Sequence, residues 1–460
     1  MSSAMSIEEK REQRRKFMLE GNLLKVIPVI ALPQVVTMLI DSLYNMADTY
    51  FVSQLGKAAT AAVGVNDSLM MIIRAISLGF GMGAASYISR QLGAKNHEEA
   101  SKAASTTIFS AMIVVGVFSV FAFIFREPLV MMLGATQTAK EYSVAYATWI
   151  LASAPFTAAS VCLAQTLRSE GSTTYSMIGS VSGCVINVFL DPLLISVMGM
   201  GVAGAAIATG ISKVITVILL MLPYWQKKCV IEVHLKYFTP KVPLYSEIAK
   251  MGIPTMLRTS LMSVSTIIIN NLAGGFGDAA LAAVSVANKS MRLVASAVMG
   301  FGQGFSPVAG FCWGAKKYNR VKKAFYITSM IGVVLCVILG LLLWVFARQA
   351  ITIFSNDPEV LSIGMILIRS QCAVLPMHVW VMISTGLFQA LGKPVQAGFL
   401  GLSRQAFSLI PCVIIMTKLW QLTGLALSQA ASDLISFCFA LVLVIPMMKE
   451  INNLSQTEEV

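Results

Sequence analysis

The sequence predicts an all-α polytopic membrane protein in which 12 transmembrane helices form two six-helix bundles. The first observation is composition: of 460 residues, 56% are hydrophobic and 12% are charged, with a mean hydropathy of +0.75. A typical soluble domain is roughly 25% charged, so this composition excludes a soluble enzyme, a disordered chain and a disulfide scaffold. A spanning helix takes about 20 residues. The second observation is an internal repeat, and the third is the placement of lysine and arginine.

Apolar runs alternate with short polar breaks along the whole chain. We expect twelve spans, beginning near residues 24, 60, 102, 140, 175, 200, 246, 280, 322, 360, 394 and 422. The breaks that follow even-numbered spans carry most of the lysine and arginine, as does the N-terminal stretch EEKREQRRK. By the positive-inside rule both termini are therefore cytoplasmic and the chain is a multi-pass inner-membrane protein. The net charge of +12 is then topological, and we expect no nucleic-acid partner.

The second half of the chain repeats the first. LGKAATAAVGV (55–65) returns as FGDAALAAVSV (276–286), and GFGMG (79–83) returns as GFGQG (300–304). Because each half holds six spans, both halves enter the membrane from the same side, and a pseudo-two-fold axis along the membrane normal relates them. The predicted organisation has five parts: a cytoplasmic segment 1–20, an N-lobe 21–225, a linker 226–245, a C-lobe 246–448 and a cytoplasmic tail 449–460.

Two packed bundles suit a transporter that works by alternating access, and the sequence offers little for an enzyme. Gly275-Phe276-Gly277-Asp278 has the GxGD form of intramembrane aspartyl proteases, but no Tyr-Asp pair accompanies it. No HExxH zinc motif and no GxxxxGK[ST] phosphate loop occurs. We therefore expect no enzyme and no cofactor, and an ion gradient is the remaining source of energy.

Acidic residues inside the predicted spans are the strongest candidates for ion coupling, because a charge in the bilayer is costly. Tyr44 and Asp48 are four residues apart and share one helix face, as do Asn187 and Asp191. Burial and a nearby like charge favour the protonated form of a carboxyl group, and the same oxygens could bind Na⁺. The alternative is a polar network that only locks helices together. The predicted cation-coupling residues are Asp48, Asp191, Asn187, Tyr44, Thr209 and Asp41. Of these, we expect that Asp48, Asn187, Asp191 and Thr209 could hold Na⁺.

Weaker candidates lie elsewhere in the spans. Pro33 and Pro254 each remove a helical hydrogen bond near the start of a span, so we predict hinges there, the alternative being static kinks. The predicted lining of a substrate cavity is Gln165, Asn270, Lys289, Arg404 and Asp433. The glycines of GFGMG and GFGQG predict close helix packing.

These features together resemble the MATE (multidrug and toxic compound extrusion) family, in its DinF-type bacterial and archaeal branch. The resemblance covers nearly the whole chain. It rests on the stretch from Pro33 that ends ADTYFVSQLG, on LGAKN, on NVFLDPLLI (187–195), on GMGVAGAAIAT (199–209) and on the paired halves.

The resemblance implies an antiporter that exports drugs or other lipophilic or cationic small molecules in exchange for H⁺ or Na⁺. It also implies a coupling site in the N-lobe, at Asp48, Tyr44, Asn187, Asp191 and Thr209. Asp41 is extra relative to the family pattern. We expect a monomer in a lipid bilayer. The main alternative is a flippase for a lipid-linked saccharide precursor, which would favour a strongly cationic cavity.

Overall fold

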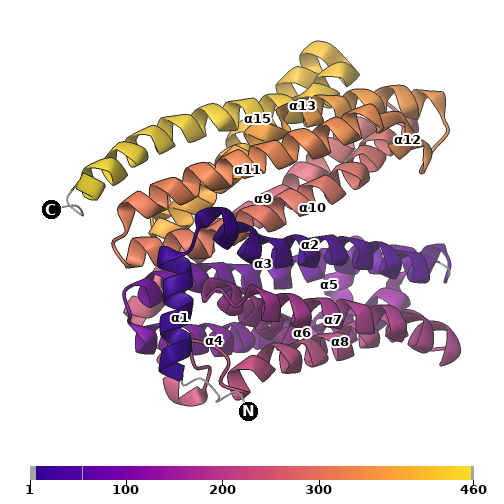
Figure 1. The fold of residues 1–460 in the computed structure, drawn as a ribbon. Coiled ribbons are helices and arrows are strands. Elements are labelled where there is room, and N and C mark those ends of the chain that lie inside the picture. Colours follow the sequence, from indigo (N-terminus) through magenta and orange to yellow (C-terminus); the bar gives the residue numbers. More distant parts are fainter. Residues whose placement is uncertain (1–6, 54, 457–460) are drawn as a thin grey trace. The chain divides into compact units, whose positions relative to one another are not determined.

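The computed structural model describes residues 7–53 and 55–456, and nearly all of them are helical (Figure 1). Two single-turn π-helical segments, η1 (Leu193–Val197) and η3 (Ser403–Leu409), and one 3₁₀ turn, η2 (Leu235–Tyr237), interrupt the α-helices. The α-helices of the first half are α1 (Ile7–Glu20), α2 (Leu23–Ser53), α3 (Lys57–Gly93), α4 (His97–Ile124), α5 (Arg126–Met132), α6 (Lys140–Ser169), α7 (Thr173–Pro192) and α8 (Gly201–Trp225). Those of the second half are α9 (Val242–Gly274), α10 (Asp278–Gly314), α11 (Tyr318–Val345), α12 (Ala347–Thr352), α13 (Pro358–Leu391), α14 (Pro394–Leu402) and α15 (Ile410–Gln456).

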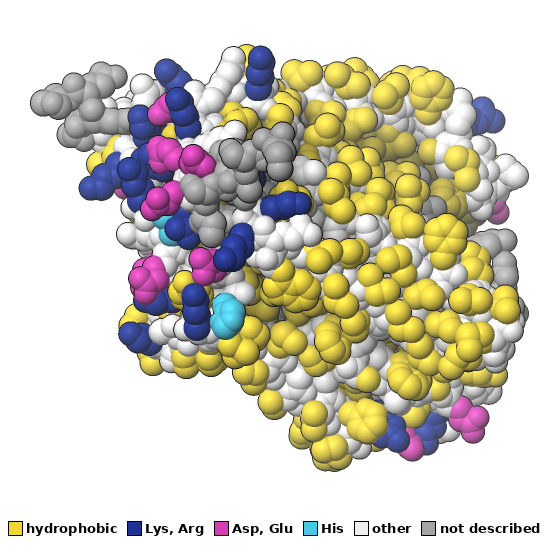
Figure 2. Space-filling model, turned by 60° about the horizontal axis from the view of Figure 1, so that its bottom comes forward, with side chains coloured by type: hydrophobic (Ala, Val, Ile, Leu, Met, Phe, Trp, Pro, Cys, Tyr) yellow, Lys and Arg dark blue, Asp and Glu magenta, His cyan; other side chains and the backbone are white. Residues whose placement is uncertain are grey.

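The twelve predicted spans are confirmed. Within residues 7–53 and 55–456, ten segments are long and apolar enough to cross a membrane by length and composition. One of them, Pro394–Gln456, contains two spans, because Trp420 and Gln421 break the helical backbone within α15. The twelfth span is α10, which is less apolar. Apolar side chains cover the sides of the helices and charged ones gather near their ends (Figure 2), as a bilayer requires.

The helix boundaries repeat as the sequence does. Residues 57–93 (α3) and 278–314 (α10) have both ends displaced by the same 221 positions, and so do residues 97–124 (α4) and 318–345 (α11). Gly56 and Gly277 precede α3 and α10 with φ of 102° and 108°, a conformation that only glycine adopts without strain. The Gly277-Asp278 pair therefore belongs to an inter-helix turn and the first residue of α10, as the repeat predicts.

The residues form two compact units, and each unit borrows part of a helix from the other half of the sequence. Unit 1 consists of residues 1–17 and 39–256, and unit 2 of residues 18–38 and 257–460. Helix α2 therefore begins in unit 2 and ends in unit 1, whereas α9 begins in unit 1 and ends in unit 2. The predicted lobes, residues 21–225 and 246–448, assign the whole of α2 to the first lobe and nearly all of α9 to the second, without this exchange. The division into these lobes stays a prediction.

Glycines explain why the borrowed segments pack where they do, and the predicted close packing at GFGMG and GFGQG is confirmed. In unit 1, a Cβ atom on Gly83 of α3 would collide with the carbonyl oxygen of Ile248 in α9. In unit 2, a Cβ on Gly304 of α10 would lie 2.6 Å from Cα of Ala31 in α2. Both separations are far below van der Waals contact, so the backbones can approach only because the side chain is a hydrogen atom.

Replacing Gly83 by alanine is therefore expected to destabilise unit 1, because the methyl group would meet a backbone carbonyl that has no rotamer to change. Overpacking of this kind costs about 1–3 kcal/mol, so the protein should unfold at a lower temperature in detergent. The control is Gly64→Ala on the same helix, since no atom lies within 4 Å of its added Cβ. That variant should be neutral or slightly stabilising, and equal losses in both variants would contradict the packing argument.

The linker after α8 is fixed to unit 1 by a buried acid. Glu170 is fully buried, and its Oε2 accepts hydrogen bonds from the backbone N–H groups of Val230 (3.1 Å) and Ile231 (3.2 Å). On α1, Arg11 Nε donates to the carbonyl oxygen of Val230 at 3.0 Å. These bonds hold the chain against α1 and the turn that follows α6 as it leaves α8.

Candidate functional site in unit 1

Two acidic side chains meet inside unit 1, carried by the second part of α2 and the end of α7. The carboxyl groups of Asp48 and Asp191 lie close enough to act on each other electrostatically. Asp191 is fully buried and Asp48 is half-buried. The carboxyl end of α7 is followed at once by η1, a π-helical interruption of the kind that is frequent at functional sites. The two acids that the sequence analysis paired are therefore electrostatic neighbours.

The polar atoms of this site lack partners. Oδ1 of Asp48, both carboxyl oxygens of Asp191 and both side-chain polar atoms of Asn187 are buried without a hydrogen bond to any described residue. Asn187 is 1% exposed and lies one helical turn before Asp191. Unsatisfied buried polar groups are costly. The carboxyl oxygens and the amide oxygen of Asn187 would be satisfied by a proton or a small cation placed among them, whereas the Nδ2 group of Asn187 needs an acceptor.

Hydroxyl groups surround the carboxyl pair. Tyr44, one turn before Asp48 on α2, contacts both acids electrostatically, and its hydroxyl group is in hydrogen-bonding contact with that of Thr209 on α8. Thr209 is 3% exposed. The five positions that the family resemblance indicates, Asp48, Asp191, Asn187, Tyr44 and Thr209, thus lie on three helices of one unit.

Two further residues belong to this cluster and were not predicted as its members. Asp67 of α3 is the charge that acts most strongly on Asp48. Tyr146 of α6 is 4% exposed, and Asp48, Asp67 and Asp191 all act on its hydroxyl group electrostatically. Sequence spacing gave no signal for Tyr146, because only the packing of α6 against α3 and α8 brings it to the site.

Asp41 lies in a different electrostatic neighbourhood. It is two helical turns from Asp48, about 10 Å along the helix axis. Asp41 and Arg74 of α3 both act on Lys213 of α8 and on the Cys184 thiol of α7. Asp41 therefore has basic neighbours, whereas Asp48 has acidic ones.

The predicted cavity-lining residues do not form one group. In unit 2, Arg404 Nε donates to Asp433 Oδ1 at 2.6 Å, and His378 Nδ1 lies 3.4 Å from the same oxygen. Arg258, which the prediction left out, acts electrostatically on Arg404 and His378, and its Nε has no partner among the described residues. These four side chains come from α9, α13, η3 and the last span of α15.

The other three predicted cavity residues have contacts or exposure of their own. Asn270 is exposed on α9, and Lys289 is exposed on α10, with Nζ 5.6 Å from the ring centroid of Phe354. Gln165 is in unit 1, where its Oε1 accepts from Nε of the buried Arg168 at 3.2 Å. That bond and the contact of Gln165 with Gly81 place it in the packing of α6 on α3.

The two predicted hinge prolines lie inside continuous helices. Pro33 is in α2, which also contains Pro28, and Pro254 is in α9. Each proline lies a few residues before the point at which its helix leaves one unit for the other, at residues 38–39 and 256–257. Thr37 Oγ1 donates to the Pro33 carbonyl at 2.8 Å, a bond that often bends a helix.

Comparison with known proteins agrees with this description. A family model named MatE matches residues 33–193 and 254–414. The chain is 26% identical over 436 residues to the multidrug export protein MepA of Staphylococcus saprophyticus, covering 94% of this chain and 96% of that protein. It is 25% identical over 426 residues to MepA of Staphylococcus haemolyticus, covering 92% and 94%.

Solved structures share the fold. A MOP superfamily transporter from Pyrococcus furiosus, whose binding pocket is described as having reversed polarity, superimposes with a TM-score of 0.89 at 23% identity, covering 95% of this chain and 98% of that one. A multidrug resistance MATE family transporter in an outward-facing conformation gives a TM-score of 0.89 at 24% identity, covering 95% and 98%.

Proposed function

The chain belongs to the MatE family, and from that premise we propose that it is a secondary active exporter of lipophilic or cationic compounds that works in exchange for H⁺ or Na⁺. The export of several drugs is the activity for which its MepA relatives are named. Those names favour a drug exporter over the alternative of a flippase for a lipid-linked saccharide, and over an enzyme. The exchange reaction and the coupling ion are inferred from the site in unit 1.

The observation that carries the proposal is the set of buried, unpartnered oxygens at Asp48, Asn187 and Asp191. When both acids are ionised, they repel each other and favour a positively charged neighbour. When a proton or Na⁺ arrives, the carboxyl groups share it and the local negative charge falls. A lipophilic cation that was attracted by that charge is then bound more weakly. One cation therefore replaces the other, which is the thermodynamic basis of exchange.

The same reasoning assigns a role to the proline-containing helices. Asp48 and Pro33 lie on one helix, and Pro33 interrupts its hydrogen-bond ladder. Asp48 lies in the part of α2 that belongs to unit 1, and Pro33 lies in the part that belongs to unit 2. A change of charge at Asp48 therefore acts on one part of the helix and not directly on the other. We infer that α2 bends near Pro33 when the coupling ion binds, with Pro254 in the equivalent place on α9. The protein alternates between inward- and outward-open states in this way.

A dye-efflux experiment in proteoliposomes tests the proposed function. The purified protein is reconstituted, a fluorescent lipophilic cation is trapped with it, and a proton gradient or a sodium gradient is imposed separately. We expect dye to move against its own gradient with one of the two ions. If the dye moves at the same rate whether or not an ion gradient is imposed, the exchange reaction is contradicted.

A further inference from the structure

One face of α4 in unit 1 is covered by the linker that follows α8. The backbone N–H groups of Glu232 and His234 donate to Ser101 Oγ (3.0 Å) and Ser105 Oγ (3.2 Å). Phe238 packs edge-to-face on Phe109, with ring centroids 6.2 Å apart. The small hydroxyl side chains on this face of α4 thus leave room for the linker and provide its acceptors.

The equivalent face of α11 in unit 2 is built differently. Displacement by 221 positions pairs Ser101 with Lys322, Ala104 with Phe325, and Ser105 with Tyr326. It also pairs Trp225, where α8 ends, with Pro446, but α15 continues as a helix to Gln456. The chain therefore does not turn back along α11 there, and the small side chains of this face are replaced by a lysine and two aromatic residues.

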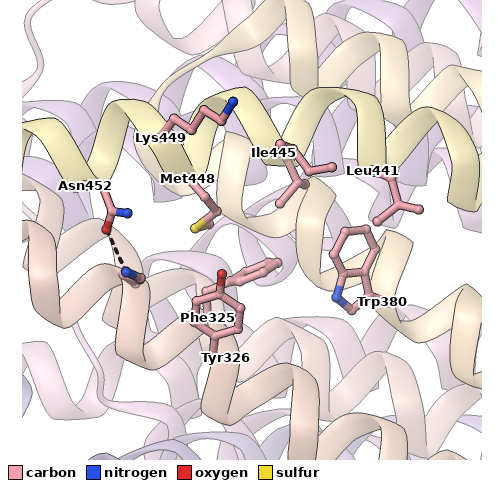
Figure 3. A pocket seen from close by; sticks show the side chains of 10 residues that line it. Phe325, Tyr326, Trp380, Leu441, Ile445, Met448, Lys449 and Asn452 are labelled. Atoms are coloured by element: carbon pink, nitrogen blue, oxygen red, sulfur yellow. Dashed lines mark hydrogen bonds between the residues drawn. The ribbon is translucent and has the colours of Figure 1, made fainter.

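A groove of about 270 Å³ lies in this place, between α11, α13 and α15 (Figure 3). Its long side is apolar and its two ends differ. Trp380 and Leu441 lie toward one end in Figure 3, and Asn452 and Lys449 toward the other. Tyr326 is 52% exposed and Ile445 is 53% exposed, so the groove opens to the surroundings of unit 2. Its lining is Lys322, Phe325, Tyr326, Trp380, Leu441, Val444, Ile445, Met448, Lys449 and Asn452.

The polar end of the groove carries positive charge. Lys322 Nζ donates to Asn452 Oδ1 at 2.6 Å, a neutral partner that leaves the ammonium charge unbalanced. Lys449 is the second cation, and no acidic residue is among those that line the groove. The positive-inside rule predicts that this lysine-containing end of the groove faces the cytoplasm. The cytoplasmic leaflet of the membrane holds the anionic lipids.

We propose that this groove binds an anionic phospholipid, with an acyl chain along Tyr326, Trp380 and Ile445 and the phosphate group between Lys322 and Lys449. An acyl chain fits an apolar groove that is open to the bilayer, and a headgroup with net negative charge matches two lysines without an acid. A returning peptide segment, which fills this place in unit 1, is replaced in unit 2 by lipid. The site is independent of the transported compound and of the coupling ion.

Tryptophan fluorescence of the full-length protein tests the proposal, because Trp380 lies in the groove. The protein is reconstituted in phosphatidylcholine vesicles with increasing amounts of phosphatidylglycerol brominated on its acyl chains. The fluorescence of the Trp380→Phe variant, which comes from the other tryptophans, is subtracted from that of the wild-type protein. We expect saturable quenching of Trp380 at a low mole fraction of brominated phosphatidylglycerol, and little with brominated phosphatidylcholine. Lys322→Gln and Lys449→Gln should each raise the half-quenching mole fraction about fivefold, the effect of losing one lysine near an anionic surface.

The matched control is Lys323→Gln, which removes an exposed charge from the same helix at a position that does not line the groove. It should leave the quenching curve unchanged, and Lys322→Arg should retain most of the affinity. Equal quenching by the two brominated lipids in the wild-type protein would overturn the proposal, as would equal effects of Lys322→Gln and Lys323→Gln. Protection of Trp380 from both lipids, together with a doubled mass by light scattering, would instead assign the groove to a second copy of the chain.

Discussion

Replacing Asp191 by asparagine is expected to slow gradient-driven export strongly while leaving the protein folded. Asparagine keeps the shape and one oxygen of aspartate but cannot release a proton or carry the charge that holds Na⁺. Asp191 is fully buried beside Asp48, so removing its charge should mimic the cation-loaded state permanently. The free energy that couples two binding sites is about 1–3 kcal/mol. The export rate under an imposed gradient should therefore fall by about 5- to 150-fold.

Asp48→Asn should give the same loss, and Asp41→Asn supplies the comparison on the same helix. Asp41 acts on Lys213 and is not among the charges that act on Asp48 or Asp191, so its asparagine variant should retain export driven by the gradient. The measurement is dye efflux with the proton or sodium gradient imposed, normalised to the amount of reconstituted protein. Wild-type export by Asp191→Asn, or an equal loss in Asp41→Asn, would remove the basis of the coupling site.

Replacing Asp433 by alanine is expected to destabilise unit 2 strongly. Asp433 is 5% exposed and accepts the 2.6 Å hydrogen bond from Arg404, with His378 and Arg258 close by. Alanine would leave two arginines without a counter-charge in a largely buried setting. Breaking a buried pair by removing one partner costs about 3–5 kcal/mol. The unfolding temperature in detergent should fall by at least about 6 °C, the scale for a domain of this size.

A double variant separates the ion pair from the side chains themselves. Arg404→Met combined with Asp433→Leu removes both charges and keeps similar volumes, and such replacements are often neutral or stabilising. It should regain most of the stability lost in Asp433→Ala. If the double variant is as unstable as the single one, the loss is due to packing and the charge argument is wrong.

Much of the fold could be predicted because it follows from local pattern. The start of every span follows from the apolar runs, and the repeat fixes equivalent turns such as those at Gly56 and Gly277. The exchange of α2 and α9 between the units was not predictable from hydropathy. It depends on close contacts such as Gly83 with Ile248 and Gly304 with Ala31, which join residues far apart in the sequence.

The residues of the candidate site likewise include some that could be predicted from the sequence and some that could not. Tyr44 with Asp48, and Asn187 with Asp191, could be predicted because each pair shares one face of a single helix. Tyr146 reaches the acids only through the packing of α6. In unit 2, Arg404, His378 and Asp433 were separate charges in the sequence, and only the fold of three different spans brings them into one cluster.

The two halves have diverged in charge although they share helix boundaries. The positions in unit 2 that correspond to Tyr44, Asp48, Asn187 and Asp191 are Ser265, Ile269, Ser408 and Cys412. None of these can bind a proton in the manner of a carboxyl group. Unit 2 instead carries the arginine-containing cluster and the lysine-ended groove. The proposed ion coupling therefore rests on the carboxyl groups of unit 1.

The central claim is that Asp48 and Asp191 exchange a small cation for the exported compound, and its most direct test is the ion released when that compound binds. The purified protein is titrated with a lipophilic cation in weakly buffered detergent solution, while a pH dye and a sodium electrode record release. We predict that wild-type protein releases H⁺ or Na⁺ in proportion to the compound bound, and that Asp191→Asn binds without release. Binding without release by the wild-type protein, or undiminished release by Asp191→Asn, would contradict the claim.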